Sequence, residues 1–235
     1  MITDLTEGSV ARKLLRFAMP LFVSNALQAV YNLVDMVVVG QYIGGAGMSA
    51  VSIGGDLLHL LTFFAMGFSS AGQVIIAQAV GSGRHDDIKK TIGTMFTIML
   101  SAAAIIALLC FAVRAPLLRL LNTPAEAYAY TMDYTVTCLA GMVFIYGYNM
   151  VSAILRGMGD SRRPFLFVAI AAVLNMVLDV LFVVVFHMAV FGAALATVIG
   201  QGVSFLFSLV YLYRHRDSFA FDFQARSFRP DPAAL

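Results

Sequence analysis

Charged residues are nearly absent from four long stretches of this chain. The stretches are 17–83, 91–113, 134–155 and 164–213. Together they contain only three charged side chains, which belong to Asp35, Asp56 and Asp179. A helix needs ~20 apolar residues to cross the ~30 Å hydrocarbon core of a bilayer, so each short stretch accommodates one crossing and each long stretch two. The pattern predicts six transmembrane helices.

The expected helices are placed within these stretches and their flanking residues. They cover about 14–40, 54–80, 91–113, 131–154, 164–186 and 191–213. Composition agrees with this assignment, because 60% of the residues are hydrophobic and 12% are charged, whereas soluble domains average ~25% charged residues. We therefore expect an all-α integral membrane protein, and a water-soluble domain is excluded.

Lysine and arginine residues are distributed unevenly between the two sides of the expected helices. Thirteen of the fifteen precede the first helix, follow the sixth, or lie in the second-to-third and fourth-to-fifth connections. Only Arg114 and Arg119 lie on the other side. Because cytoplasmic connections are enriched in Lys and Arg, both termini are expected in the cytoplasm. The net charge of +2 is thus a topology signal, and no nucleic-acid partner is expected.

Two aspartates lie well inside expected helices, Asp35 in the first and Asp179 in the fifth. A carboxylate at the centre of a span costs ~2.5–3.5 kcal/mol, so both should face a protein interior. Other polar side chains accompany them at helical spacing: Asn25, Gln28, Asn32, Asn175, Thr197, Gln201, Ser204 and Ser208. Such oxygens suit a small cation, or a carboxyl group that binds and releases a proton. The alternative is that they only form hydrogen bonds between helices.

The remaining motifs do not support an enzyme. The segment 157–160 has the GxGD pattern of intramembrane aspartyl proteases, but it lies in an arginine-rich connection, and no Tyr-Asp dipeptide supplies a second catalytic carboxylate. The four histidines are dispersed and lack the spacing of a zinc site. Cys110 and Cys138 are expected to be free thiols. We expect no catalytic residue and no cofactor.

Several segments resemble the multidrug and toxic compound extrusion (MATE) family of transporters. Met19-Pro20-Leu21 precedes Tyr31-Asn32-Leu33-Val34-Asp35 in the first expected helix. The connection 155–164 has the sequence LRGMGDSRRP, which is similar to the family's LRGxGD[ST]RxP loop. Asn175, Asp179 and the segment 192–197 follow in the family's order.

The resemblance implies one six-helix lobe of a twelve-helix antiporter, in which two lobes surround a central cavity. Such an antiporter exports small organic compounds, often amphipathic and cationic, from the cytoplasm across a bacterial-type plasma membrane in exchange for Na+ or H+. Position by position, the cation site falls on Asp35, Asn175, Asp179 and Thr197. The bending proline of the first helix falls on Pro20. The residues expected to line the substrate cavity are Gln28, Tyr31, Asn32 and Asn149.

The expected organisation has three parts. They are a cytoplasmic N-terminal segment (1–13), the six-helix transmembrane lobe (14–213) and a cytoplasmic linker toward a second lobe (214–235). Because the chain has about half the family's length, we expect a truncated sequence; a natural half-transporter that pairs with a second copy is the alternative. Two other functions stay open, a flippase for lipid-linked or polysaccharide cargo and a non-transporting membrane partner lobe.

Overall fold

Helices account for all regular secondary structure in the described part of the chain, residues 10–216 of a computed structural model. They are α1 (Val10–Ile43), α2 (Gly45–Gly81), α3 (His85–Ala112), α4 (Arg114–Leu120), α5 (Tyr128–Ala140), α6 (Met142–Gly157), α7 (Arg162–Asp179), the π-helix η1 (Val180–Val185) and α8 (Ala189–Arg214). The predicted N-terminal segment up to residue 9 and the predicted linker from residue 217 lie outside the described residues.

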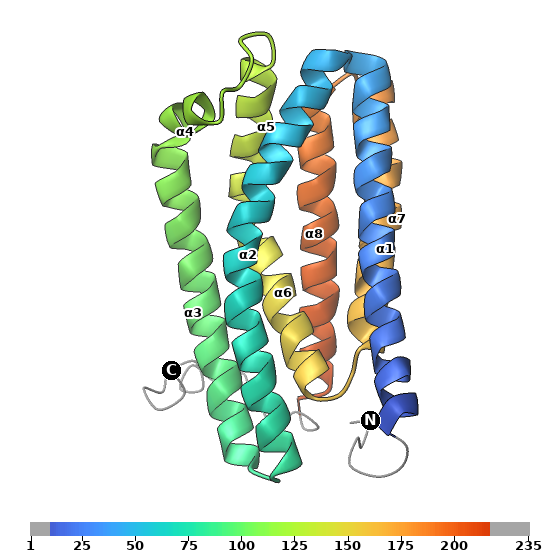
Figure 1. Cartoon of the computed structure of the whole chain (residues 1–235), viewed down its shortest axis with the longest axis vertical. Helices are drawn as coiled ribbons and strands as arrows, with labels where there is room; N and C mark the ends of the chain where they lie inside the picture. The colour runs from blue at the N-terminus through green and yellow to red at the C-terminus, as the bar shows by residue number, and fades with distance from the viewer. Residues whose placement is uncertain (1–9, 217–235) are drawn as a thin grey trace.

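The long helices run alongside one another as an antiparallel bundle (Figure 1). α1 begins and α8 ends at the same end of the bundle, which we call the terminal end. At the opposite end a single residue, Gly44, joins α1 to α2, and its φ of 85° suits glycine but strains other residues. Because the turn is this short, α2 begins at Gly45, so the sequence-based start near residue 54 is wrong.

Within residues 10–216, five helices are long and apolar enough to cross a membrane: α1, α2, α3, α7 continued by η1, and α8. α5 and α6 form a sixth crossing if the pair is counted as one, with a bend of 50° between them. A Cβ at Gly141, which lies at the bend, would come within 2.6 Å of Val198 Cγ2, so the glycine lets α8 approach closely. The all-helical membrane fold is confirmed, but the predicted helix 131–154 is bent, and α4 was not predicted.

From Leu166 onward the outward face of α7 is aliphatic, and it continues so into η1. Its exposed side chains recur at helical spacing and are Leu166, Ile170, Val173, Val177 and Val180. A stripe of this length would be unfavourable in water, and it fits contact with lipid chains. The opposite face of α7 packs against α1 and α8 and carries the buried polar side chains of Asn175 and Asp179.

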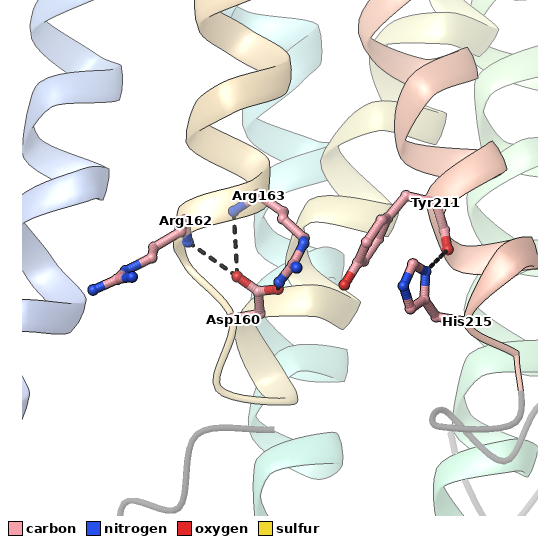
Figure 2. A network of polar contacts seen from close by, with 5 residues as sticks. All are labelled: Asp160, Arg162, Arg163, Tyr211 and His215. Carbon is pink, nitrogen blue, oxygen red and sulfur yellow. Dashed lines mark hydrogen bonds and ion pairs between the residues drawn. The ribbon is translucent and has the colours of Figure 1, made fainter. Parts of the chain in front are cut away.

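Asp160 holds the connection between α6 and α7 together at the terminal end (Figure 2). Its Oδ1 accepts hydrogen bonds from the backbone N–H groups of Arg162 (3.1 Å) and Arg163 (3.2 Å), and its Oδ2 pairs with Arg163 Nη1 at 2.7 Å. The Arg163 guanidinium lies 4.7 Å from the centre of the Tyr211 ring, and that ring contacts His215 at the end of α8. The GxGD motif is therefore a turn that caps α7 and ties it to α8.

Asp160→Ala is expected to lower the free energy of unfolding by about 1–2 kcal/mol, because two backbone N–H groups at the start of α7 lose their acceptor. Asp87→Ala is the matched control: the Asp87 side chain is 43% exposed against 12% for Asp160, and it forms a solvent-exposed ion pair with Arg84. The control should shift stability by less than ~0.5 kcal/mol. Thermal unfolding of the purified protein in detergent measures both, and equal shifts would contradict the capping role.

Candidate cation site

Three helices bring polar side chains together inside the bundle. α1 contributes Asp35, α7 contributes Asn175 and Asp179, and α8 contributes Thr197. Asp35 is 5% exposed, Asn175 is 3% exposed and Asp179 is fully buried, while Thr197 is half-buried. Asp35 and Asp179 are close enough to interact electrostatically. The structure thus brings all four predicted cation-site residues into one region.

The Asn175 side chain links Asp179, on the same helix α7, to Thr197 on α8. One orientation of its amide satisfies both ends: Nδ2 donates to Asp179 Oδ2 at 3.3 Å, and Oδ1 accepts from the Thr197 backbone N–H at 3.2 Å. In the opposite orientation Nδ2 lies 3.4 Å from Thr197 Oγ1. We adopt the first orientation because hydrogen-bond partners decide how an amide is placed. Asn175 therefore positions the Asp179 carboxylate relative to α8.

The backbone of the fifth crossing changes its winding directly after Asp179. Asn175 and Asp179 are one α-helical turn apart, which places them on the same face of α7. From Val180 to Val185 the chain continues as the π-helix η1. π-Helical turns are rare and occur frequently at functional sites. The sequence of η1 is uniformly apolar and contained no signal for this change.

Each aspartate has an oxygen atom that is buried and lacks a hydrogen-bond partner among residues 10–216, Oδ1 of Asp35 and Oδ1 of Asp179. An ionised carboxylate that is buried without compensation is strongly destabilising, so each group favours binding a cation or a proton. Carboxylate, amide and hydroxyl oxygens are hard ligands suited to a small cation. In the same residues no group of three or more His, Cys, Asp or Glu side chains is placed to hold a metal ion.

A small cavity adjoins the site between α1, α7 and α8. Its lining residues are Gln28, Tyr31, Val168, Ala171, Ala172, Asn175, Thr197, Gly200, Gln201 and Ser204. The volume of the cavity is about 20 Å³, which is enough for one or two water molecules. Pockets for drug-sized ligands are typically ~300–1,000 Å³, so an organic substrate does not fit here.

Only two of the four predicted substrate-cavity residues line this cavity, Gln28 and Tyr31. Asn32 is exposed on α1, and Asn149 donates a hydrogen bond to the Ile145 carbonyl one turn back on α6. The structure brings neither of these to the cavity. α1 continues as a helix through Pro20, whose carbonyl accepts a hydrogen bond from Ser24 Oγ at 2.8 Å, and the bending role of Pro20 stays a prediction.

Two polar residues of the cavity were not among the predicted site residues, Gln201 and Ser204. Gln201 lines the cavity together with Tyr31, and Ser204 Oγ donates to the Phe167 carbonyl at 2.9 Å. The sequence feature that could have identified them is their spacing. They follow Thr197 at intervals of four and three residues, on one face of α8. Spacing alone did not distinguish a cavity wall from contacts between helices.

The comparisons with known proteins agree with this architecture. The MatE family model matches residues 20–181. The probable multidrug resistance protein YpnP of Bacillus subtilis is 34% identical over 91% of this chain, and the match covers 48% of YpnP. The probable multidrug resistance protein YoeA of the same organism is 32% identical over 95% of this chain and is covered to 49%. The chain thus spans about half the length of the curated relatives it matches.

Solved structures give the same result in three dimensions. An outward-facing multidrug resistance MATE family transporter superposes on 97% of this chain with a TM-score of 0.90 and 26% identity, and 50% of that transporter is covered. A crystal structure of a MATE protein in the bent conformation superposes with a TM-score of 0.89, at the same identity and coverage. In both cases the bundle of α1–α8 corresponds to half of the larger molecule.

Proposed function

This chain belongs to the MATE family, whose members are transporters and not enzymes, and we propose that it forms one lobe of a cation-coupled exporter of organic compounds. The observation that carries the proposal is the pair of buried aspartates, each with an oxygen that has no partner among the described residues. If these positions only held helices together, neutral amides would serve without the cost of burying an ionisable group. A pair of carboxylates instead supports reversible binding of Na+ or H+.

Coupling between cation transport and substrate transport follows from the charges of the two aspartates. Two carboxylates in a poorly hydrated site repel each other unless a cation or protons neutralise them. Cation binding at Asp35 and Asp179 favours one arrangement of the lobes, and cation release favours the other. A substrate that binds more tightly to the second arrangement is exported as cations enter the cell.

The substrate binds outside this lobe's own cavity, in the space between this lobe and a second one. The small volume of the lobe cavity supports this location. So does the coverage of relatives, since the matched transporters are about twice as long as this chain. The second lobe is the other half of a longer chain or, less simply, a second copy of this one. The substrates are amphipathic organic compounds, often cationic.

The proposed location is a bacterial-type plasma membrane, with the terminal end of the bundle in the cytoplasm. The asymmetry of Lys and Arg supports this orientation. Most of the described basic residues lie at the terminal end (Figure 1). They belong to the start of α1, the α2–α3 connection, the α6–α7 connection and the end of α8. Arg114 and Arg119 both lie on α4 at the opposite end.

The test is a transport assay with the full-length protein that contains this lobe. Purified protein is reconstituted into vesicles loaded with a cationic dye such as ethidium, and Na+ and pH gradients are imposed separately. One gradient is expected to accelerate dye movement against its own concentration gradient, and the other is expected to have little effect. No acceleration under either gradient would contradict the proposal. A parallel assay with a fluorescent lipid-linked saccharide tests the flippase alternative, for which we expect no movement.

A further inference from the structure

The cavity beside the cation site is elongated along the bundle. On α7 its lining runs from Asn175 to Val168, and on α8 from Thr197 to Ser204. Seven residues of α-helix correspond to about 10 Å along the axis. α7 begins and α8 ends at the terminal end, so Val168 and Ser204 both lie closer to that end than Asn175 and Thr197 do. The cavity therefore extends from the cation site toward the terminal end.

The third wall, on α1, shows the same direction. Gln28 and Tyr31 line the cavity, and Gln28 precedes Tyr31 on a helix that starts at the terminal end. Asp35 lies one turn beyond Tyr31, farther from that end. Asn175 and Thr197 thus form the inner end of the cavity, and Gln28 and Ser204 lie at its outer end. Asp35 and Asp179 lie one helical turn beyond the lining residues Tyr31 and Asn175.

The lining combines polar side chains with very small ones. Gln28, Tyr31, Gln201 and Ser204 provide amide and hydroxyl oxygens along its length, and Ala171, Ala172 and Gly200 leave the space open. A Cβ on Gly200 would lie 3.3 Å from the Ala171 carbonyl oxygen and 3.4 Å from Asn175 Cβ. The absence of a side chain at Gly200 therefore sets the width of the cavity next to Asn175.

We propose that this cavity is the inner part of the route by which the coupling cation moves between the Asp35–Asp179 site and the aqueous phase at the terminal end. Gln28 and Gln201 act as transient oxygen ligands along it, and Gly200 keeps it open beside Asn175. A volume of about 20 Å³ admits a cation with one or two water molecules, so side-chain oxygens must replace the rest of its hydration shell. The inference rests on the proposed function and adds the path and side of cation release.

The test compares two substitutions of the same kind on α8 in the full-length protein. Gly200→Ala narrows the route, whereas a Cβ on Gly202 meets Phe144 at an ordinary contact distance of 3.6 Å. Vesicles containing each variant are assayed for 22Na+ exchange and, with a trapped pH dye, for H+ exchange. We expect Gly200→Ala to slow exchange of the coupling ion by about tenfold, equivalent to about 1.4 kcal/mol in the barrier. The half-saturating ion concentration should change by less than about twofold, and Gly202→Ala should match the unsubstituted protein.

A second variant, Gln201→Leu, removes the polar group while keeping the side chain similar in size. It should also slow exchange, and it decides the question if Gly200→Ala does not fold. Unchanged exchange in Gln201→Leu, or equal exchange in Gly200→Ala and Gly202→Ala, would overturn the route while leaving the proposed function intact. If the unsubstituted protein exchanges neither ion, the proposed function fails and the route fails with it.

Discussion

Asp35→Asn is expected to reduce cation-driven efflux by about 100-fold or more, corresponding to about 3 kcal/mol of lost cation binding. The substitution keeps the size of the side chain but removes its charge and its capacity to bind a proton. Asp179 then faces no second carboxylate, so the repulsion that makes cation binding necessary is removed. The measurement is gradient-driven dye efflux from vesicles that contain the full-length protein. Asp179→Asn is expected to have an effect of similar size.

Asp56→Asn is the matched control for this prediction. Asp56 undergoes the same chemical change in another membrane-spanning helix, but it is exposed on α2 and outside the cation site. Its efflux should stay within about twofold of the unsubstituted protein. Asp35→Asn should still insert and purify normally, because a neutral amide is less costly in a span than a carboxylate. Undiminished efflux in Asp35→Asn would exclude the assignment of the cation site.

Burial of the aspartates could be predicted from the sequence. Which of the polar side chains near Asp35 on α1 share its buried face could not. Residues on an α-helix are separated by ~100°, so Tyr31 lies about 40° from Asp35 on one side and Asn32 about 60° away on the other. α1 packs mainly against α7, with fewer contacts to α2 and α8, and so buries only a narrow face. That narrow face includes Tyr31 and leaves Asn32 exposed. A single polar stripe in the sequence thus becomes two surfaces in the structure.

The bends of the bundle could not be predicted from the sequence either. Hydropathy registers how apolar a segment is, and neither Gly141 nor the start of η1 at Val180 interrupts an apolar run. Gly141 is one of 19 glycines, many of them inside helices, so its identity alone does not mark a bend. The reason for this glycine is the approach of Val198 from α8, a contact between residues far apart in the chain.

The LRGMGDSRRP motif contains a glycine whose role is clear only in three dimensions, and Gly157→Ala is expected to destabilise the protein by about 1–3 kcal/mol. A Cβ on Gly157 would lie 2.8 Å from the Gln73 carbonyl oxygen and 3.0 Å from Ile76 Cβ, both on α2. A backbone carbonyl within a helix cannot rotate away, so α6 and α2 would have to separate. The adjacent Arg156 Nε donates to Gln73 Oε1 at 3.0 Å, and this bond would be strained as well.

Gly55→Ala provides the control, because a Cβ at Gly55 meets nothing within 4 Å. Gly55 lies inside α2, where alanine favours the helix over glycine by ~1 kcal/mol. The two substitutions should therefore move the thermal unfolding midpoint in opposite directions, Gly157→Ala down and Gly55→Ala up. A thiol-reactive dye can follow unfolding in detergent, because Cys138 is fully buried in the folded bundle. If Gly157→Ala left the midpoint unchanged, close contact between α6 and α2 could not be the reason for a glycine at this position of the motif.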